Sequence, residues 1–133
     1  WLTRQLRADP ALSGTPDAPL VLAGFSFGSF VQTRVASRLA AAGTPAQRMI
    51  LVGPATSRFE VDTVPADTLV IHGEVDDVVP LSSVFDWARP QGLPVVVIPG
   101  TDHFFHRRLP VLKRLVLGFL AAPAGIDGAP DSE

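Results

Sequence analysis

The chain has 133 residues, of which 47% are hydrophobic and 18% are charged, and its formal net charge at pH 7 is −2. This composition is sufficient for one packed domain, and the scattered basic residues exclude a nucleic-acid footprint and a polybasic membrane patch. The absence of cysteine excludes a disulfide framework and a thiolate metal site. No apolar run approaches the roughly 18 residues that span a bilayer, so we expect no membrane partner. No signal peptide is visible in a chain that begins at Trp1, and we expect a cytoplasmic location.

Proline and glycine divide the chain into alternating strand and helix patterns. Short apolar runs of the kind found in buried parallel strands predict strands over residues 20–23, 49–52, 69–71 and 95–98. Helical spacing of apolar residues predicts helices over residues 30–39, 82–88 (with Ser82 or Ser83 as N-cap) and 111–120. The remaining stretches are predicted as the end of a helix, a connecting loop and a disordered tail, at residues 1–8, 9–19 and 122–133 respectively.

The alternation of strands and helices predicts an α/β fold in residues 1–121, with a parallel sheet of about four strands and helices on both of its faces. In such sheets, functional residues gather at the carboxyl ends of the strands. Candidate site residues are therefore expected directly after the apolar runs.

The first apolar run leads into Gly24-Phe25-Ser26-Phe27-Gly28, and a helical pattern follows at once. This is a G-x-S-x-G pattern in a strand–turn–helix context, which is typical of a nucleophilic serine on a strained turn. Its glycines are expected to let neighbouring segments approach closely. The backbone N–H of Phe27, at a helix N-terminus, is expected to donate to an oxyanion that develops during the reaction.

A serine nucleophile needs a base, and three histidines are candidates. His103 directly follows the fourth predicted strand, as the geometry of a parallel sheet requires, and we favour it. His72 ends the third strand and is more consistent with a buried imidazole that holds a loop together. His106 lies beside two arginines and is more consistent with a solvated surface group.

The third member of such a site is a carboxylate that orients the histidine. The loop after the third strand offers Glu74, Asp76 and Asp77, and the order Ser26, then Asp76 or Asp77, then His103 is the order found in α/β-hydrolases. One of these acids is expected to lie in a solvated turn, and Asp102 is expected to act as a local cap.

The segments GFSFGSF, HGEVDDVVP and GTDHFFHRRL resemble the small lidless α/β-hydrolases over about residues 20–120. The similarity points to short bacterial hydrolases of the dienelactone hydrolase and carboxylesterase kind. It implies that Ser26 is the nucleophile and His103 the base. The family pattern H-G-x-x-D-x-V-V-P places the acid at Asp76. It also implies that neither a metal nor an organic cofactor takes part.

Members of this family carry further strands before the serine turn, and one loop among them supplies a second oxyanion donor. Only residues 1–19 precede the first predicted strand here. We therefore expect the chain to be the C-terminal portion of the fold, and we expect residues 1–133 alone to be poorly soluble and weakly active.

The predicted function is hydrolysis of a small-molecule carboxylic ester, or a related acyl bond, through an acyl-enzyme. The candidates for the substrate pocket are Phe25, Phe27, Phe104 and Phe105, and above all Phe25 and Phe104, with ordinary core packing as the alternative for each. Two other functions stay open: thioester hydrolysis or acyl transfer at the same residues, and a non-catalytic interaction module. The sequence does not predict the oligomeric state.

Overall fold

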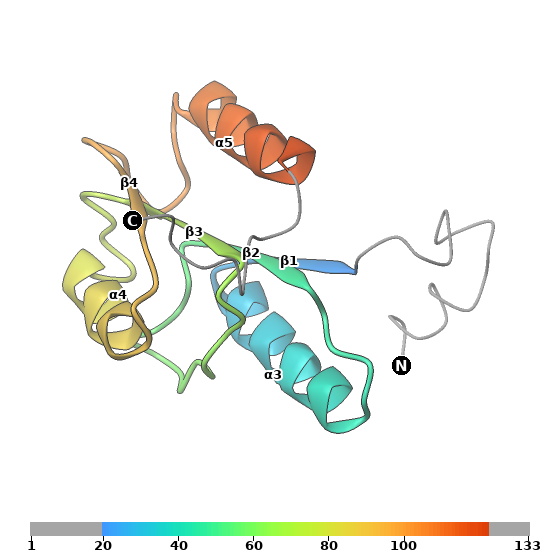
Figure 1. The fold of residues 1–133 in the computed structure, drawn as a ribbon. Helices are drawn as coiled ribbons and strands as arrows, with labels where there is room; N and C mark the ends of the chain where they lie inside the picture. The colour runs from blue at the N-terminus through green and yellow to red at the C-terminus, as the bar shows by residue number, and fades with distance from the viewer. Residues whose placement is uncertain (1–19, 123–133) are drawn as a thin grey trace, which may run out of the picture.

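Residues 20–122 are described by the computed structural model, and a four-stranded parallel sheet lies at their centre (Figure 1). Its strands are β1 (Val21–Phe25), β2 (Arg48–Val52), β3 (Thr68–Gly73) and β4 (Val96–Ile98). Their order in the sheet is β1-β2-β3-β4, and all three pairings are parallel. The predicted fold class is confirmed.

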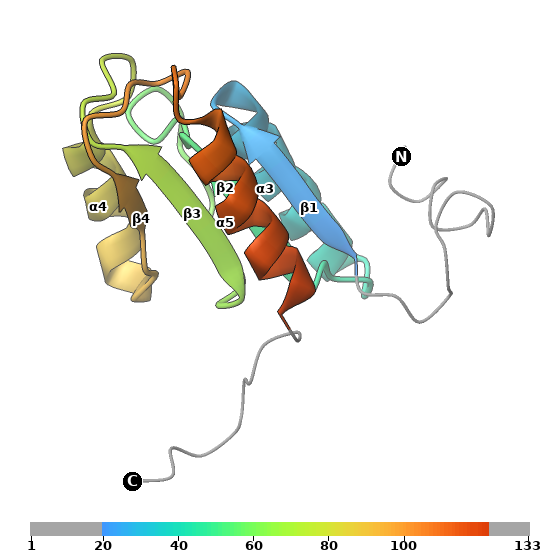
Figure 2. The same cartoon turned by 90° about the horizontal axis from the view of Figure 1, so that it is seen from above.

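Helices cover both faces of this sheet. Helices α3 (Phe27–Ala41) and α4 (Leu81–Ala88) lie on one face, and α5 (Leu109–Ala121) crosses the other (Figures 1 and 2). Both α3 and α4 connect neighbouring parallel strands, and right-handed crossovers in the same sheet direction place them on the same side. A short 3₁₀ helix, η1 (Arg89–Gln91), continues α4. Among residues 20–122, no helix is long and apolar enough to cross a membrane.

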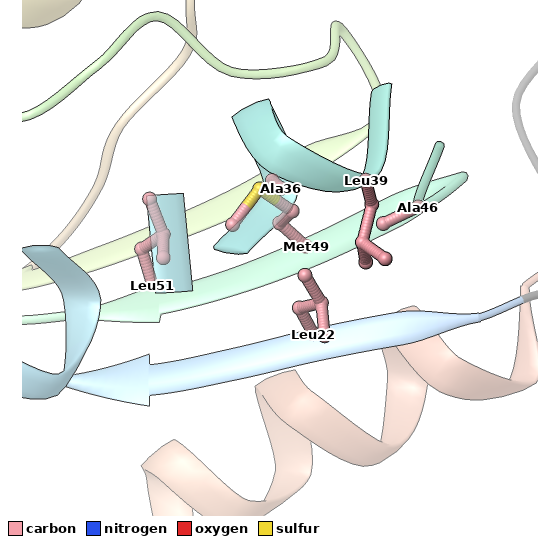
Figure 3. Packing of buried hydrophobic residues seen from close by; sticks show 6 residues of the cluster. All are labelled: Leu22, Ala36, Leu39, Ala46, Met49 and Leu51. Atoms are coloured by element: carbon pink, nitrogen blue, oxygen red, sulfur yellow. The ribbon is translucent and has the colours of Figure 1, made fainter. Parts of the chain in front are cut away.

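Strand β2 lies between two hydrophobic clusters, one on each face of the sheet, and all five of its residues are buried. Met49 and Leu51 pack with Leu22 under α3 (Figure 3), while Ile50 and Val52 face the side of α5. Fully burying one such side chain stabilises the fold by about 1.5–3 kcal/mol. The uninterrupted apolar run is thus explained by burial on both faces of the sheet.

One buried cation fastens α5 to the amino end of β2. The Arg48 side chain lies with Nε 2.9 Å from Asp67 Oδ2, and its guanidinium carbon lies 3.9 Å from the centre of the Phe119 ring. Its Nη1 donates to the Ala122 carbonyl at 3.2 Å. Arg48 therefore joins the end of the last helix to the start of a central strand.

The connection from β2 to β3 contains no helix, and none was predicted there. Two details differ from the sequence prediction. Helix α4 begins at Leu81 after Pro80, and no side chain caps it; the Ser83 hydroxyl instead donates to the Pro80 carbonyl at 2.8 Å. Leu120 is exposed, whereas the other predicted apolar residues of α5 pack on the sheet. The predictions for residues 1–8, 9–19 and 123–133 lie outside the described residues.

Candidate active site

Ser26 occupies a strained turn between β1 and α3. Its φ of 55° and ψ of −120° lie in a region that residues with a Cβ rarely adopt, at a cost of about 1–3 kcal/mol. The Ser26 amide donates to the Val52 carbonyl at 2.9 Å, which fixes the turn to the end of β2. Ser26 is the N-cap of α3, but its hydroxyl does not cap the helix; Oγ lies 2.9 Å from His103 Nε2.

The two glycines that flank this turn differ in their packing. A Cβ on Gly24 would lie 2.6 Å from the Gly28 carbonyl oxygen, so only glycine fits there. A Cβ on Gly28 would meet no described atom within 4 Å. The expected close approach is therefore present at the first glycine, and no described neighbour requires it at the second.

His103 follows β4 and is 2% exposed. The Phe25 and Phe104 rings each lie with their centres 5.1 Å from the imidazole centre, and Phe104 meets it edge-on. Gly53 lies at the end of β2, where a Cβ would be 3.3 Å from His103 Cε1. Aromatic rings and the backbone of a neighbouring strand thus hold the imidazole in place.

Asp76 follows β3, and its carboxylate is completely buried. Oδ2 lies 2.6 Å from His103 Nδ1, while Oδ1 accepts the backbone N–H groups of Val78 and Val79 at 2.9 and 2.7 Å. A carboxylate only accepts hydrogen bonds, so Nδ1 of His103 donates its proton to Asp76. Nε2 then presents a lone pair to the Ser26 hydroxyl, which donates to it.

The loops that carry Asp76 and His103 are fastened to each other. Val75 N–H donates to the Thr101 carbonyl at 3.0 Å, and the Gly100 N–H donates to Glu74 Oε1 at 2.8 Å. A Cβ on Gly73 would lie 2.3 Å from the Thr101 carbonyl oxygen, so this approach requires glycine. Sequence reasoning missed both Gly53, which directly follows β2, and Gly73, which ends β3.

Asp77 and His106 lie outside this hydrogen-bonded series, whereas His72 lies beside it. Asp77 is exposed, in a solvated turn. His106 is exposed at the surface, and Asp102 accepts from the His106 backbone N–H at 2.9 Å, as a local cap does. The side-chain hydrogen bond from His106 lowers the pKa of Asp102 below its ordinary value. His72 is fully buried beside Asp76.

Phenylalanines surround the turn on two sides, and most of them are not core residues. Phe25 and Phe104 are 43% and 58% exposed, and they contact each other as well as His103. Phe27 is also exposed and contacts Phe59, a residue of the β2–β3 connection that no sequence signal singled out. Phe105, in contrast, is a buried core residue. Within residues 20–122, no group of three or more metal-binding side chains could hold an ion.

Comparison with protein families matches residues 8–80, more than half of the chain, to the thioesterase domain. The chain belongs to the thioesterase-domain family. This is an α/β-hydrolase family, so the predicted superfamily is confirmed. The matched residues of the thioesterase domain include Ser26 and Asp76 and end before His103.

Solved structures of bacterial serine hydrolases resemble this thioesterase-domain chain. An α/β serine hydrolase without a lid from Xanthomonas campestris is 32% identical, with a TM-score of 0.76 over 92% of this chain and 56% of its own. An α/β serine hydrolase homologue from Coxiella burnetii is 29% identical, with a TM-score of 0.69 over 90% of this chain and 55% of its own. The chain therefore spans about half the length of these relatives. A comparison of this chain with curated protein sequences found no match.

Proposed function

We propose that this protein is a serine hydrolase of carboxylic esters, with Ser26 as nucleophile, His103 as general base and Asp76 as the acid that orients it. The observation that carries the proposal is the continuous hydrogen-bonded series from Ser26 Oγ to His103 Nε2 and from His103 Nδ1 to Asp76 Oδ2, at 2.9 and 2.6 Å. Its members come from three loops at the same edge of a parallel sheet, where the chemistry of such folds gathers.

In the proposed mechanism, the Ser26 hydroxyl attacks the ester carbonyl while its proton passes to His103 Nε2. Charge develops on the carbonyl oxygen, and the backbone N–H of Phe27 donates to it. Phe27 is the first residue of α3, so its N–H has no partner within the helix. His103 then gives the proton to the departing alkoxide, and the acyl group remains on Ser26.

Water completes the proposed cycle. His103 takes a proton from a water molecule, the resulting hydroxide attacks the acyl-enzyme, and the proton returns to Ser26 as the carboxylic acid leaves. Throughout, Asp76 keeps Nδ1 of His103 protonated and stabilises the charged imidazolium. Both carboxylate oxygens serve as acceptors, one for two backbone N–H groups and the other for the imidazole N–H.

We assign the apolar part of the substrate to the exposed rings of Phe25 and Phe104. Contiguous exposed apolar surface marks binding sites, and these two rings contact each other and lie against the base itself. Phe104→Ala is expected to reduce kcat/KM for a hexanoyl ester more than for an acetyl ester. Phe85→Ala, which removes an exposed ring from α4, is the matched control and should leave this ratio unchanged.

A thioester is the second candidate substrate, and the match to the thioesterase domain favours it. Both substrates would pass through the same acyl-enzyme, and they differ only in the leaving group. Measuring kcat/KM for an oxygen ester and a thioester with the same acyl group separates the two. A preference of more than tenfold for the thioester, about 1.4 kcal/mol, would replace the ester assignment.

A fluorophosphonate probe tests the proposal as a whole, because it labels an activated serine and ignores an inert one. The wild-type chain and Ser57→Ala, which lacks an exposed serine, should be labelled equally, whereas Ser26→Ala should not be labelled. Ester hydrolysis by Ser26→Ala should fall by many orders of magnitude. Equal labelling of all three chains, or no labelling of the wild type, would indicate a non-catalytic module.

A further inference from the structure

His72 is a fully buried histidine for which the proposed mechanism has no role. It lies in β3, four residues before Asp76, and its Nε2 is 2.8 Å from the Val79 carbonyl oxygen and 3.3 Å from Asp76 Oδ2. Its Nδ1 is buried and has no hydrogen-bond partner among the described residues. Burying a polar side chain in this manner costs free energy, so its position calls for a reason.

The partners of His72 determine where its proton lies. A carbonyl oxygen only accepts, so Nε2 carries the proton and donates it to the Val79 carbonyl, and Asp76 Oδ2 lies 3.3 Å from the same nitrogen. Nδ1 faces no acceptor among the described residues that would stabilise a second proton. Burial lowers the pKa of His72, and this effect outweighs the hydrogen bond to Val79 and the charge of Asp76, which raise it. His72 is therefore a neutral donor.

This donor lies against the acid and shares the Val79 backbone with it. The Val79 N–H donates to Asp76 Oδ1, the Val79 carbonyl accepts from His72, and His72 also lies within reach of Asp76 Oδ2. Oδ2 is the oxygen that accepts from His103. A neutral donor at this place fixes the carboxylate and leaves its charge in place. A lysine or arginine here would cancel that charge.

We propose that His72 is a positioning residue, which holds the Asp76 carboxylate in line with His103 through its Nε2–H. The proposal rests on the proposed function of Ser26, His103 and Asp76, but it concerns a residue that does not touch the substrate. Removing the donor should loosen the Asp76–His103 hydrogen bond and slow the chemical step. Substrate binding should be unaffected.

The test compares His72→Leu, which removes the donor, with His72→Gln, whose side-chain amide keeps a donor at a similar distance from the backbone. We expect kcat of His72→Leu to fall by roughly 10- to 100-fold, as for other residues that orient a functional side chain, with KM within about twofold. His72→Gln should recover most of the loss. Rates are normalised by titration of the reactive serine with a fluorophosphonate, so a misfolded fraction does not count.

A second readout does not need turnover. The low-field proton resonance of His103 Nδ1–H, observed by NMR in the full chain, should shift or broaden in His72→Leu and return in His72→Gln. An unchanged resonance with kcat within twofold in His72→Leu would overturn the proposal, and so would equal damage by Leu and Gln in both readouts. If the wild type hydrolyses nothing and labels no serine, the proposed function fails, and the resonance still decides the role of His72.

Discussion

Replacing Asp76 by asparagine alters the site by a single atom. One orientation of the amide keeps an oxygen for the N–H groups of Val78 and Val79, and it then turns an NH2 group toward His103 Nδ1 and His72 Nε2. The reversed amide opposes the two backbone donors instead. In either orientation, donors face donors in a place where the wild-type carboxylate accepts from every neighbour.

The most favourable way to relieve this opposition of donors is a change of tautomer in His103. If Nδ1 becomes the acceptor, it can take a proton from the asparagine, but Nε2 then carries hydrogen and can no longer accept from Ser26. The equivalent change in a well-studied serine protease reduces kcat by about 10⁴-fold, because the tautomer is wrong while the geometry is intact. At 1.36 kcal/mol per factor of ten, this corresponds to about 5.4 kcal/mol in the activation barrier.

Two measurements test this expectation: kcat for a short-chain aryl ester, and the rate at which a fluorophosphonate labels Ser26. Both should fall by at least about 1000-fold in Asp76→Asn. The matched control is Asp77→Asn, which changes the exposed neighbouring acid and should keep both rates within about twofold of wild type. Melting temperatures show whether either chain remains folded. If Asp77→Asn is the more damaging change, or if folded Asp76→Asn keeps more than a tenth of the rate, the assignment of the acid is wrong.

Three further predictions concern stability, measured by denaturant unfolding. Gly24→Ala forces a Cβ to 2.6 Å from a carbonyl oxygen and should destabilise the fold by about 1–3 kcal/mol. Gly28→Ala meets no described neighbour and should be neutral or stabilising. Equal losses of stability in the two variants would contradict the packing argument. Because burial lowers the pKa of His72 below its ordinary 6.5, the unfolded chain binds its proton first. Below pH 6.5, the free energy of unfolding of the wild type should therefore fall by up to about 1.4 kcal/mol per pH unit relative to that of His72→Gln. Parallel curves of unfolding free energy against pH for the two chains would refute this. Arg48→Met removes a buried guanidinium that contacts Asp67 and the Ala122 carbonyl and should cost about 1.5–3 kcal/mol, a value that a loss below about 0.5 kcal/mol would exclude.

The sequence predicted the parts of this molecule that depend on burial and on strand direction. The apolar runs correspond to the four strands because parallel strands covered on both faces are mostly apolar. Ser26, Asp76 and His103 lie together because each is in the loop or turn after a strand, and the carboxyl ends of parallel strands meet at one edge. His72 and His106 also lie where expected, one buried and one at the surface.

The details that were missed depend on contacts between distant segments. Nothing in the local sequence distinguishes Gly24 from Gly28, and the difference arises only from where the helix carbonyl lies. Phe59 comes from an irregular connection without periodicity, so its contact with Phe27 carries no sequence signal. The start of α4 was misplaced by one residue because a Ser beside a helix normally caps it, whereas here Pro80 precedes the first turn.

The matching order of the strands along the chain and across the sheet has a consequence for folding kinetics. Ser26 and His103 are separated by 77 residues, and β2 and β3 lie between the strands that carry them. Their hydrogen bond can close only after every intervening pairing has formed, and such non-local pairings are slow compared with helix formation. During refolding, the reactivity of Ser26 toward a fluorophosphonate should therefore appear with the slowest phase, well after the helical signal in circular dichroism. The nucleophile would then act as a built-in reporter of the last step of sheet assembly.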